Sequence, residues 1–319
     1  MRNVTLRQLR IFACVARQLS FTRAARELHL TQPAISQQIK LLESEVGLPL
    51  FEHIGRRIHL TAAGEELLRY ADEALELMRN AGETFAAMRG LRRGTLKLAA
   101  VSTAKYFTPS LLRAFTPAYP EVSVKFSVGN RQEIIRQLAT NETDLVIMGR
   151  PPRELDTIAE SFARHPFVFI APPDHPLARR RRLRLEQLAG ESFLIREEGS
   201  GTRASTEHFF REQGVPLRAT LEFSSNETIK QGVMAGMGLS FISLHTVGLE
   251  LQSGRLVVLD VVGTPVVRDW FVIHLRAKHL SPIAAEFRRF LLEHGAETIR
   301  RAVGLESTPK ISGSRAPAA

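Results

Sequence analysis

The sequence predicts a multidomain α/β protein with an N-terminal winged helix-turn-helix, a long helix, and a larger half made of two α/β lobes. Three observations support this fold class. Two short amphipathic helical patterns meet at a polar break within residues 20–46, a proline-free helical stretch covers residues 61–90, and apolar runs then alternate with helical patterns. The 319 residues also exceed the length of one average domain.

These patterns set the predicted boundaries. We assign residues 1–60 to the winged helix-turn-helix, 61–90 to the linker helix and 91–303 to the two lobes. One lobe is expected to comprise about 95–165 plus 266–303, and the other 166–265. Residues 304–319 lack periodicity and predict a disordered tail.

Within residues 1–60, the apolar spacing predicts three helices around one core. The first helix would pack behind the other two through Leu6, Leu9, Phe12, Ala13 and Ala16. Ser20 can cap the second helix and Thr31 the third, whose first turn tolerates Pro33. A single cysteine, Cys14, lies in the apolar pattern of the first helix, which predicts a buried small side chain rather than a redox sensor.

The polar face of the third helix has the chemistry of a DNA-reading surface. Its outward residues are Gln32, Ser36, Gln37 and Lys40. Amide side chains can bond adenine edges with two hydrogen bonds, and the ring of Pro33 can contact a thymine methyl group. The alternative is an ordinary helix pair with a solvated polar face.

The charge balance is basic, and the excess is concentrated near the N-terminus. The chain has 43 Lys and Arg against 33 Asp and Glu, a formal net charge of +10, and about half of this excess falls within residues 1–60. Such an excess favours polyanion binding, although it can also serve solubility.

A short hairpin is expected after Gly47. Apolar residues there flank the tip Gly55-Arg56-Arg57, which predicts a two-stranded wing. Its paired arginines can contact backbone phosphates or a minor groove. An exposed basic turn without such a contact is the alternative.

The helix predicted over residues 61–90 carries a heptad seam. The seam residues step alternately by three and four positions and comprise Leu68, Ala71, Leu75, Met78, Gly82 and Phe85. A seam of this kind can pack on its own domain. A long helix between two domains more often pairs with a copy of itself, and this would bring two DNA-reading helices to two half-sites.

From residue 95 the pattern predicts a mainly parallel α/β arrangement. The expected strands are 96–101, 122–128, 145–148, 167–171, 193–195, 221–224, 239–242, 256–261 and 270–275. The expected helices are 109–119, 131–139, 202–213, 227–235 and 282–294. About 200 residues without a second long linker favour two small lobes around a cleft.

Residues that follow the predicted strands suggest a site for a small anion. Ligands in open α/β sheets bind beyond the carboxyl ends of strands, and free N–H groups at a helix N-terminus suit a phosphate or carboxylate. The candidate ligand-binding residues are Ser102, Thr103, Lys105, Gly149, Arg150, Gly201, Thr202, Arg203 and Asn226. A merely capped turn is the alternative at the sequence Gly199-Ser200-Gly201-Thr202.

The motifs of common enzyme classes are missing from the sequence. It contains no GxxxxGK[ST] loop, HExxH pair, GxSxG elbow or Cys/His cluster, so we expect neither catalytic residues nor a metal site. No window approaches eighteen apolar residues, and the N-terminus lacks the features of a signal peptide. A soluble cytoplasmic protein without membrane contact is therefore expected.

Residues 20–43 match the pattern SFTxAAxxLxxxQPAxSxQIxxLE, and the chain resembles LysR-type transcriptional regulators. The resemblance implies an effector domain similar to periplasmic binding proteins and a homodimer, commonly a dimer of dimers. It also implies promoter DNA and RNA polymerase as partners, and association with the nucleoid. The expected DNA-contacting residues are Ser20, Thr22, Thr31, Gln32, Pro33, Ser36, Gln37, Lys40, Arg56 and Arg57.

Separate segments such as VSTAKYFTPSLLRAF, NETDLVIMGRPP and SNETIKQGVMAGMGLSFISLHT resemble the CbbR-type activators of Calvin-cycle CO2-fixation operons. This narrower resemblance implies an anionic effector such as ribulose 1,5-bisphosphate, phosphoenolpyruvate or NADPH, and no resident cofactor. A regulator of another metabolic operon with a different anion is the first alternative. A solute-binding protein is the second, although transport would not need the N-terminal reader.

Overall fold

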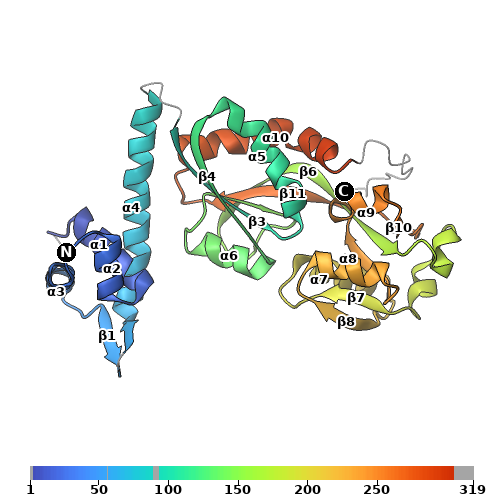
Figure 1. Cartoon of the computed structure of the whole chain (residues 1–319), viewed down its shortest axis with the longest axis horizontal. Helices are drawn as coiled ribbons and strands as arrows, with labels where there is room; N and C mark the ends of the chain where they lie inside the picture. The colour runs from blue at the N-terminus through green and yellow to red at the C-terminus, as the bar shows by residue number, and fades with distance from the viewer. Residues whose placement is uncertain (1–2, 56, 89–92, 305–319) are drawn as a thin grey trace. The chain divides into compact units, whose positions relative to one another are not determined.

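The computed structural model describes residues 3–55, 57–88 and 93–304, and contacts divide the chain into a unit of residues 1–91 and a unit of residues 92–319 (Figure 1). The first unit contains α1 (Leu6–Gln18), α2 (Phe21–Glu27), α3 (Gln32–Val46), β1 (Phe51–Ile54), β2 (Arg57–Leu60) and α4 (Ala62–Met88). Of the tail predicted for 304–319, only Gly304 belongs to the described residues.

The second unit is larger and mixes strands with helices. Its strands are β3 (Arg93–Val101), β4 (Glu121–Gly129), β5 (Leu145–Met148), β6 (Thr157–Ala171), β7 (Phe193–Arg196), β8 (Ala219–Phe223), β9 (Ser240–Ser243), β10 (Val257–Val258) and β11 (Val266–Leu275). Its α-helices are α5 (Thr108–Phe115), α6 (Arg131–Ala139), α7 (Gly201–Glu212), α8 (Asn226–Met234), α9 (Gly248–Gln252) and α10 (Pro282–Ala302).

Helix α1 is the centre of the first unit. All six residues from Ile11 to Ala16 are buried, because α2, α3 and α4 pack around this part of the helix. Cys14 lies in this core, as the apolar pattern predicts. The prediction that Leu6 packs inward is wrong: its side chain is 43% exposed, since it lies in the first turn, ahead of the packed segment.

The helix-turn-helix forms as the sequence predicts, with both caps in place. The hydroxyl of Ser20 accepts a hydrogen bond from the backbone N–H of Arg23, and that of Thr31 accepts one from Ala34. His29 takes a left-handed conformation in the turn, with φ of 52°. These local features orient α3 and bury Ile35, Ile39 and Leu42 against the rest of the unit.

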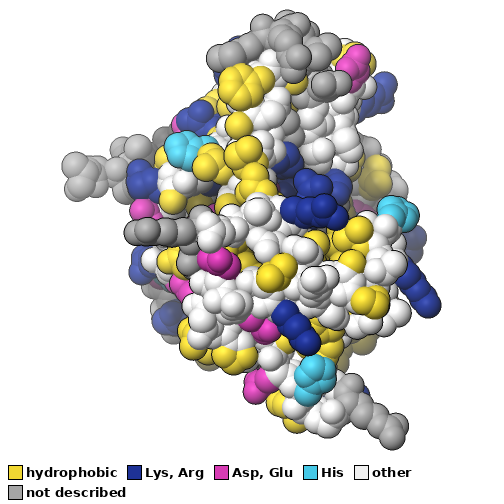
Figure 2. Space-filling view, turned by 90° about the vertical axis from the view of Figure 1, so that its left-hand side faces the viewer, with side chains coloured by type: hydrophobic (Ala, Val, Ile, Leu, Met, Phe, Trp, Pro, Cys, Tyr) yellow, Lys and Arg dark blue, Asp and Glu magenta, His cyan; other side chains and the backbone are white. Residues whose placement is uncertain are grey.

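Helix α4 uses its predicted seam in two different ways. Its N-terminal part packs on α1, where Ala71 is fully buried and Asp72 accepts a 2.5 Å bond from Arg17. Two later residues of the predicted seam, Met78 and Phe85, stay 54% and 61% exposed, and so do their neighbours on the helix Tyr70 and Leu77, at 53% and 54%. Figure 2 shows hydrophobic side chains gathered in a broken vertical band on this unit. The first unit therefore covers only part of the seam and leaves the remainder open.

The second unit is organised by one seven-stranded sheet with the order β10-β6-β11-β5-β3-β4, in which β9 also pairs with β6. Figure 1 shows α5 and α10 on one side of the strands β3 to β5 and α6 on the other. Strands β7 and β8 form a separate parallel pair, and α7 and α8 both contact β7. The predicted two-lobed α/β architecture is confirmed.

Two regions of buried side chains correspond to the two lobes. One comprises residues from β3, β5, α5, α6, α10 and the end of β11, with Trp270 among them. The other region comprises two clusters drawn from residues 167–261. The long strands β6 and β11 contribute to both regions, so they join the lobes.

The sheet differs from the mainly parallel one that the sequence predicts. Only β3 pairs in parallel with β4 and β5, whereas β6 pairs antiparallel with β9, β10 and β11, and β11 pairs antiparallel with β5. Apolar runs report burial but not strand direction, which explains the difference. The sequence also misses α9, makes β6 too short, and ends α10 eight residues early.

Burial of His245 makes the stability of the second unit depend on pH. The Nε1–H of Trp270 donates to Nδ1 of His245 at 3.0 Å, and both side chains are buried. Burial lowers the pKa of His245 to about 4. Because the folded pKa lies below the unfolded value, the stabilisation is complete above pH 6.5 and is lost as the pH falls towards 4.

We therefore expect the second unit to lose about 3 kcal/mol of stability at His245 between pH 6.5 and pH 4. Trp270 is the one tryptophan of the chain, so denaturant unfolding followed by its fluorescence reports on this unit. His245→Gln should make the pH dependence shallower, whereas the exposed His29→Gln should leave it unchanged. An identical pH dependence in His245→Gln would contradict this assignment.

Candidate functional site

The outward face of α3 is a polar surface at the start of a well-capped helix. Gln32, Gln37 and Lys40 are exposed, and Ser36 is half-buried. The amide nitrogen of Gln32 donates to the hydroxyl of Ser36 at 2.9 Å, which aligns these two side chains one helical turn apart. Amide, hydroxyl and ammonium groups on one face supply the donors and acceptors that can read base edges in a major groove.

The other predicted DNA-contacting residues differ in their surroundings. Thr22, Thr31 and Pro33 are exposed, whereas Ser20 is half-buried and already caps α2. In the wing, Ile54 pairs with Arg57 beside the turn at Gly55, and Arg57 is exposed. Arg56 lies outside the described residues.

Most of the cations that the structure describes in the first unit have no ion pair with a carboxylate. Arg17 pairs with Asp72, but within residues 3–55 and 57–60 no ion pair involves the exposed residues Arg7, Arg10, Arg23, Arg26, Lys40 and Arg57. Unpaired cations of this kind attract a polyanion at long range, and the attraction weakens with salt.

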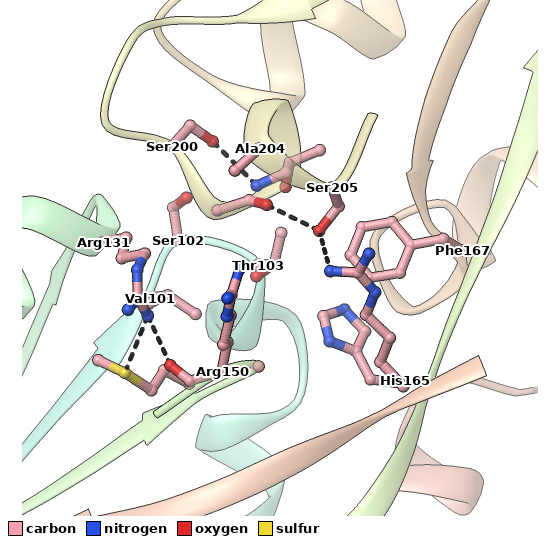
Figure 3. A pocket seen from close by; sticks show the side chains of 15 residues that line it. Val101, Ser102, Thr103, Arg131, Arg150, His165, Phe167, Ser200, Ala204 and Ser205 are labelled. Carbon is pink, nitrogen blue, oxygen red and sulfur yellow. Dashed lines mark hydrogen bonds between the residues drawn. The ribbon is translucent and has the colours of Figure 1, made fainter. Parts of the chain in front are cut away.

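A pocket in the second unit lies where the ends of β3 and β5 meet the N-terminus of α7 (Figure 3). It encloses about 640 Å³ of space, part of it open to solvent. Ser102 and Thr103 follow β3, Gly149 and Arg150 follow β5, and Ser200 to Thr202 begin α7. Thr103 is buried, and its hydroxyl makes no hydrogen bond to the described residues.

The long strands β6 and β11 provide the rest of the pocket lining. His165 and Arg268 are directly opposite each other in the antiparallel register, so their side chains share one face of the sheet. The Arg268 guanidinium donates to the hydroxyl of Ser205 at 2.9 Å and lies over the ring of Phe167 at 5.9 Å. This face thus links the two strands to α7.

The pocket is strongly cationic. Arg131, Arg150 and Arg268 line it, and none of the described lining residues is a carboxylate. Arg131 donates to the carbonyl oxygen of Arg150 at 2.5 Å, which fixes its guanidinium at the pocket wall (Figure 3). Burial lowers the pKa of Arg131 and of Arg268, and the charge of Arg150 adds to the effect in both. Three guanidinium groups held close together favour an anionic ligand.

Six of the nine predicted ligand-binding residues line this pocket: Ser102, Thr103, Gly149, Arg150, Gly201 and Thr202. Lys105 and Arg203 do not. Lys105 pairs with Glu227 at 3.6 Å, and Arg203 is held by Glu207 at 2.8 Å and Glu222 at 2.5 Å. These ion pairs keep both cations out of the pocket lining. The strand-end pattern does not reveal such pairs, because it takes no account of residues distant in the sequence.

Asn226 also lies outside the pocket lining and belongs to a buried network beside it. Its side-chain oxygen accepts a 2.8 Å bond from Arg196, which also donates to the hydroxyl of Ser102 at 3.1 Å. Arg196 is 2% exposed and pairs with Glu197. This network connects the end of β7 with the end of β3, and so holds the pocket residue Ser102 in place.

The sequence pattern misses three cationic or titratable pocket residues: Arg131, His165 and Arg268. Arg131 follows Gly129, the last residue of β4, so the strand-end rule could have found it. His165 and Arg268 lie within long strands, and only the pairing of β6 with β11 brings them together.

Two family models match almost the whole described chain. Residues 6–65 match the bacterial regulatory helix-turn-helix protein of the lysR family, and residues 89–296 match the LysR substrate binding domain. The chain belongs to the LysR family. Since this is a family of transcriptional regulators, the prediction of a DNA-binding regulator that is not an enzyme is confirmed.

Individual relatives of this LysR protein are also regulators. It is 48% identical to the HTH-type transcriptional regulator CfxR of Cupriavidus necator, over 95% of this chain and 96% of that protein. It is 47% identical to the RuBisCO operon transcriptional regulator of Allochromatium vinosum, over 92% of this chain and 97% of that protein.

Solved LysR structures have the same fold. The CcmR regulatory domain from Synechocystis, in complex with 2-PG, is 40% identical, with a TM-score of 0.61 over 63% of this chain and 97% of that one. Full-length CbnR complexed with its target DNA is 25% identical, with a TM-score of 0.63 over 94% of this chain and 100% of that one. Within the described residues, each helix is too short or too polar to cross a lipid bilayer.

The wing arginine should act on DNA of any sequence. Arg57→Ala removes one cation beside the wing tip, so it should weaken binding to specific and random DNA by the same factor. The slope of log affinity against log salt concentration should become shallower by about 1. Fluorescence anisotropy over a salt series measures both quantities. Loss of affinity confined to one base-pair variant would contradict a phosphate contact.

Gln32 should instead act on one base pair. Gln32→Ala removes the amide from the exposed face of α3, so affinity for the preferred operator should fall about tenfold. Affinity for operators changed at the contacted position should stay nearly constant. A panel of single-base operator variants measures this loss of discrimination, and an equal loss on every variant would assign Gln32 a structural role.

Proposed function

We propose that this LysR regulator controls CO2-fixation genes, including a RuBisCO operon, in response to a small anionic metabolite. The observation that carries the proposal is the 47% identity, over 92% of the chain, to a relative named as a RuBisCO operon transcriptional regulator. The cationic pocket supports the second part, because it has the charge that a phosphorylated metabolite requires.

The proposed DNA-binding form is a homodimer, assembled further into a dimer of dimers. The exposed apolar side chains of α4 support this assembly, because burying them against a second copy removes about half of their surface from water. A symmetric dimer would place two copies of α3 on two half-sites of a promoter. Contact of this assembly with RNA polymerase would then activate transcription.

The proposed DNA interface is the exposed face of α3 together with the wing. Base contacts are assigned to Gln32, Ser36, Gln37 and Lys40, with Pro33 against a thymine methyl group, and phosphate contacts to Arg56 and Arg57. Thr22 and Thr31 are exposed and are assigned to contacts with the DNA backbone, while Ser20 acts as the cap of α2.

The proposed effector is a small anion bound among Arg131, Arg150 and Arg268. The related CcmR domain was solved with 2-PG, which supports a ligand at the regulatory domain. Ribulose 1,5-bisphosphate, phosphoenolpyruvate and NADPH remain the other candidates, and no resident cofactor is proposed. Among the described residues no group of three or more His, Cys, Asp or Glu side chains could hold a metal ion.

Footprinting tests the proposed function. The full chain, at fixed salt, should protect DNA upstream of its own gene and the divergent neighbouring gene. The length or bend of the footprint should change with 2-PG, ribulose 1,5-bisphosphate, phosphoenolpyruvate or NADPH. A footprint that ignores all four would favour a LysR regulator of another operon, and no footprint at all would contradict the DNA-binding assignment.

Thr103 provides a specific test of the pocket. Thr103→Val keeps the shape of this buried side chain. It removes only the hydroxyl, which makes no hydrogen bond to the described residues. We expect the effector-dependent change in the footprint to disappear, while binding to the promoter without effector keeps its affinity. Loss of both activities would indicate a folding defect rather than a ligand contact.

A further inference from the structure

The floor of the pocket contains a stack of rings with His165 at its surface. His165 extends from β6 and lines the pocket, and its ring stacks on Trp270 with a centroid distance of 3.7 Å and an interplanar angle of 16°. At the indole N–H edge of Trp270 lies the roughly parallel ring of His245, whose centroid is 6.4 Å from that of Trp270 and 6.1 Å from that of His165. Figure 3 shows the imidazole of His165 pointing from its strand towards the middle of the pocket.

The two histidines of this stack differ in their hydrogen bonding. His245 accepts the indole N–H of Trp270 at its Nδ1. His165 is 3% exposed, and among the described residues neither its Nδ1 nor its Nε2 has a hydrogen-bond partner. A neutral imidazole has one donor and one acceptor nitrogen, and burial of both without partners destabilises a fold. The packing of the protein therefore does not explain a histidine at this position.

The surroundings keep the ring of His165 uncharged at the pocket wall. Burial, then repulsion by His245 and Arg268, hold the pKa of His165 well below its usual range. Gly149 packs directly against this ring: a Cβ atom there would lie 2.8 Å from Nδ1 of His165, so the position has no room for a side chain. His165 therefore presents a neutral N–H group beside three permanently charged guanidinium groups.

We propose that His165 is a specificity-determining residue of the pocket, which donates its ring N–H to an oxygen atom of the bound anion. This inference rests on the proposed function, because it assigns a contact to the same effector. The arginines pair with the negative charge of the ligand, and His165 selects a ligand whose phosphate or carboxylate oxygen reaches the Trp270 stack. The unpartnered ring nitrogens of His165, which destabilise the free protein, thus provide the group that binds the effector.

This trade-off predicts opposite changes in stability and affinity. His165→Phe and His165→Leu both fill the space next to Trp270 without a polar nitrogen. The melting temperature of the full chain without effector should stay the same or rise in at least one of these variants. Affinity for the probe that the wild-type protein binds, among 2-PG, ribulose 1,5-bisphosphate, phosphoenolpyruvate and NADPH, should fall about tenfold or more. Calorimetric titration measures the affinity.

His245→Phe is the matched control, because it changes the other histidine next to Trp270, the one that accepts the indole N–H. This variant should lower the melting temperature, since the buried indole N–H of Trp270 loses its acceptor. A melting temperature that falls as far in both His165 variants as in His245→Phe would overturn the inference. So would unchanged probe affinity in both.

The failure of the proposed function can be distinguished from the failure of this inference. If the wild-type protein binds none of the four probes, the proposed effector class is wrong. The melting temperatures of the wild type and the two His165 variants without effector then still decide whether His165 destabilises the fold.

Discussion

The antiparallel pairing of β6 with β11 is the interaction on which the second unit depends. Its register runs from Val266 opposite Phe167 to Leu275 opposite Thr157; β6 supplies buried residues to both lobes, and β11 supplies them to one lobe and packs Val266 against the other. One irregularity falls between Trp270 and Phe271, opposite residues 161–163. There Phe162 and Ala163 are both buried, which strict alternation would not allow. The pairing therefore joins the lobes and also decides which side chains face the pocket.

In the pocket, the fold places like charges close together at the position proposed for the ligand. Three arginines repel one another there, and burial, followed by the charge of Arg150, lowers the pKa of Arg131 and of Arg268. Two of the guanidinium groups have hydrogen-bond acceptors within the protein, the carbonyl of Arg150 for Arg131 and the hydroxyl of Ser205 for Arg268. Elsewhere in the same unit, cations meet carboxylates directly, as in the buried pair of Lys278 with Asp144 at 3.2 Å. A bound anion would supply at the pocket what the carboxylates supply elsewhere.

In the first unit the helical core is closely packed, and the function is assigned to exposed surfaces. Residues 11–16 of α1 are enclosed by the other helices, so the polar face of α3 is supported by a tightly packed core. The open apolar face of α4 and the unpaired cations of this unit are the two features that its own packing leaves unused. They correspond to the two partners of a LysR regulator, a second copy and DNA.

The sequence by itself determined the first unit and the strand-end part of the pocket. The caps Ser20 and Thr31, the buried faces of α2 and α3, and the positions of Thr103, Gly149 and Thr202 all depend on residues close together in the chain. Local hydrogen bonds and a fixed hydrophobic period are sufficient to predict such features. Only the tertiary structure decided the direction of β6 and β11, because an apolar run has the same pattern in either direction. The tertiary structure also places His165 opposite Arg268, although about one hundred residues separate them in the sequence. It further pairs Lys105 and Arg203 with carboxylates outside the pocket lining.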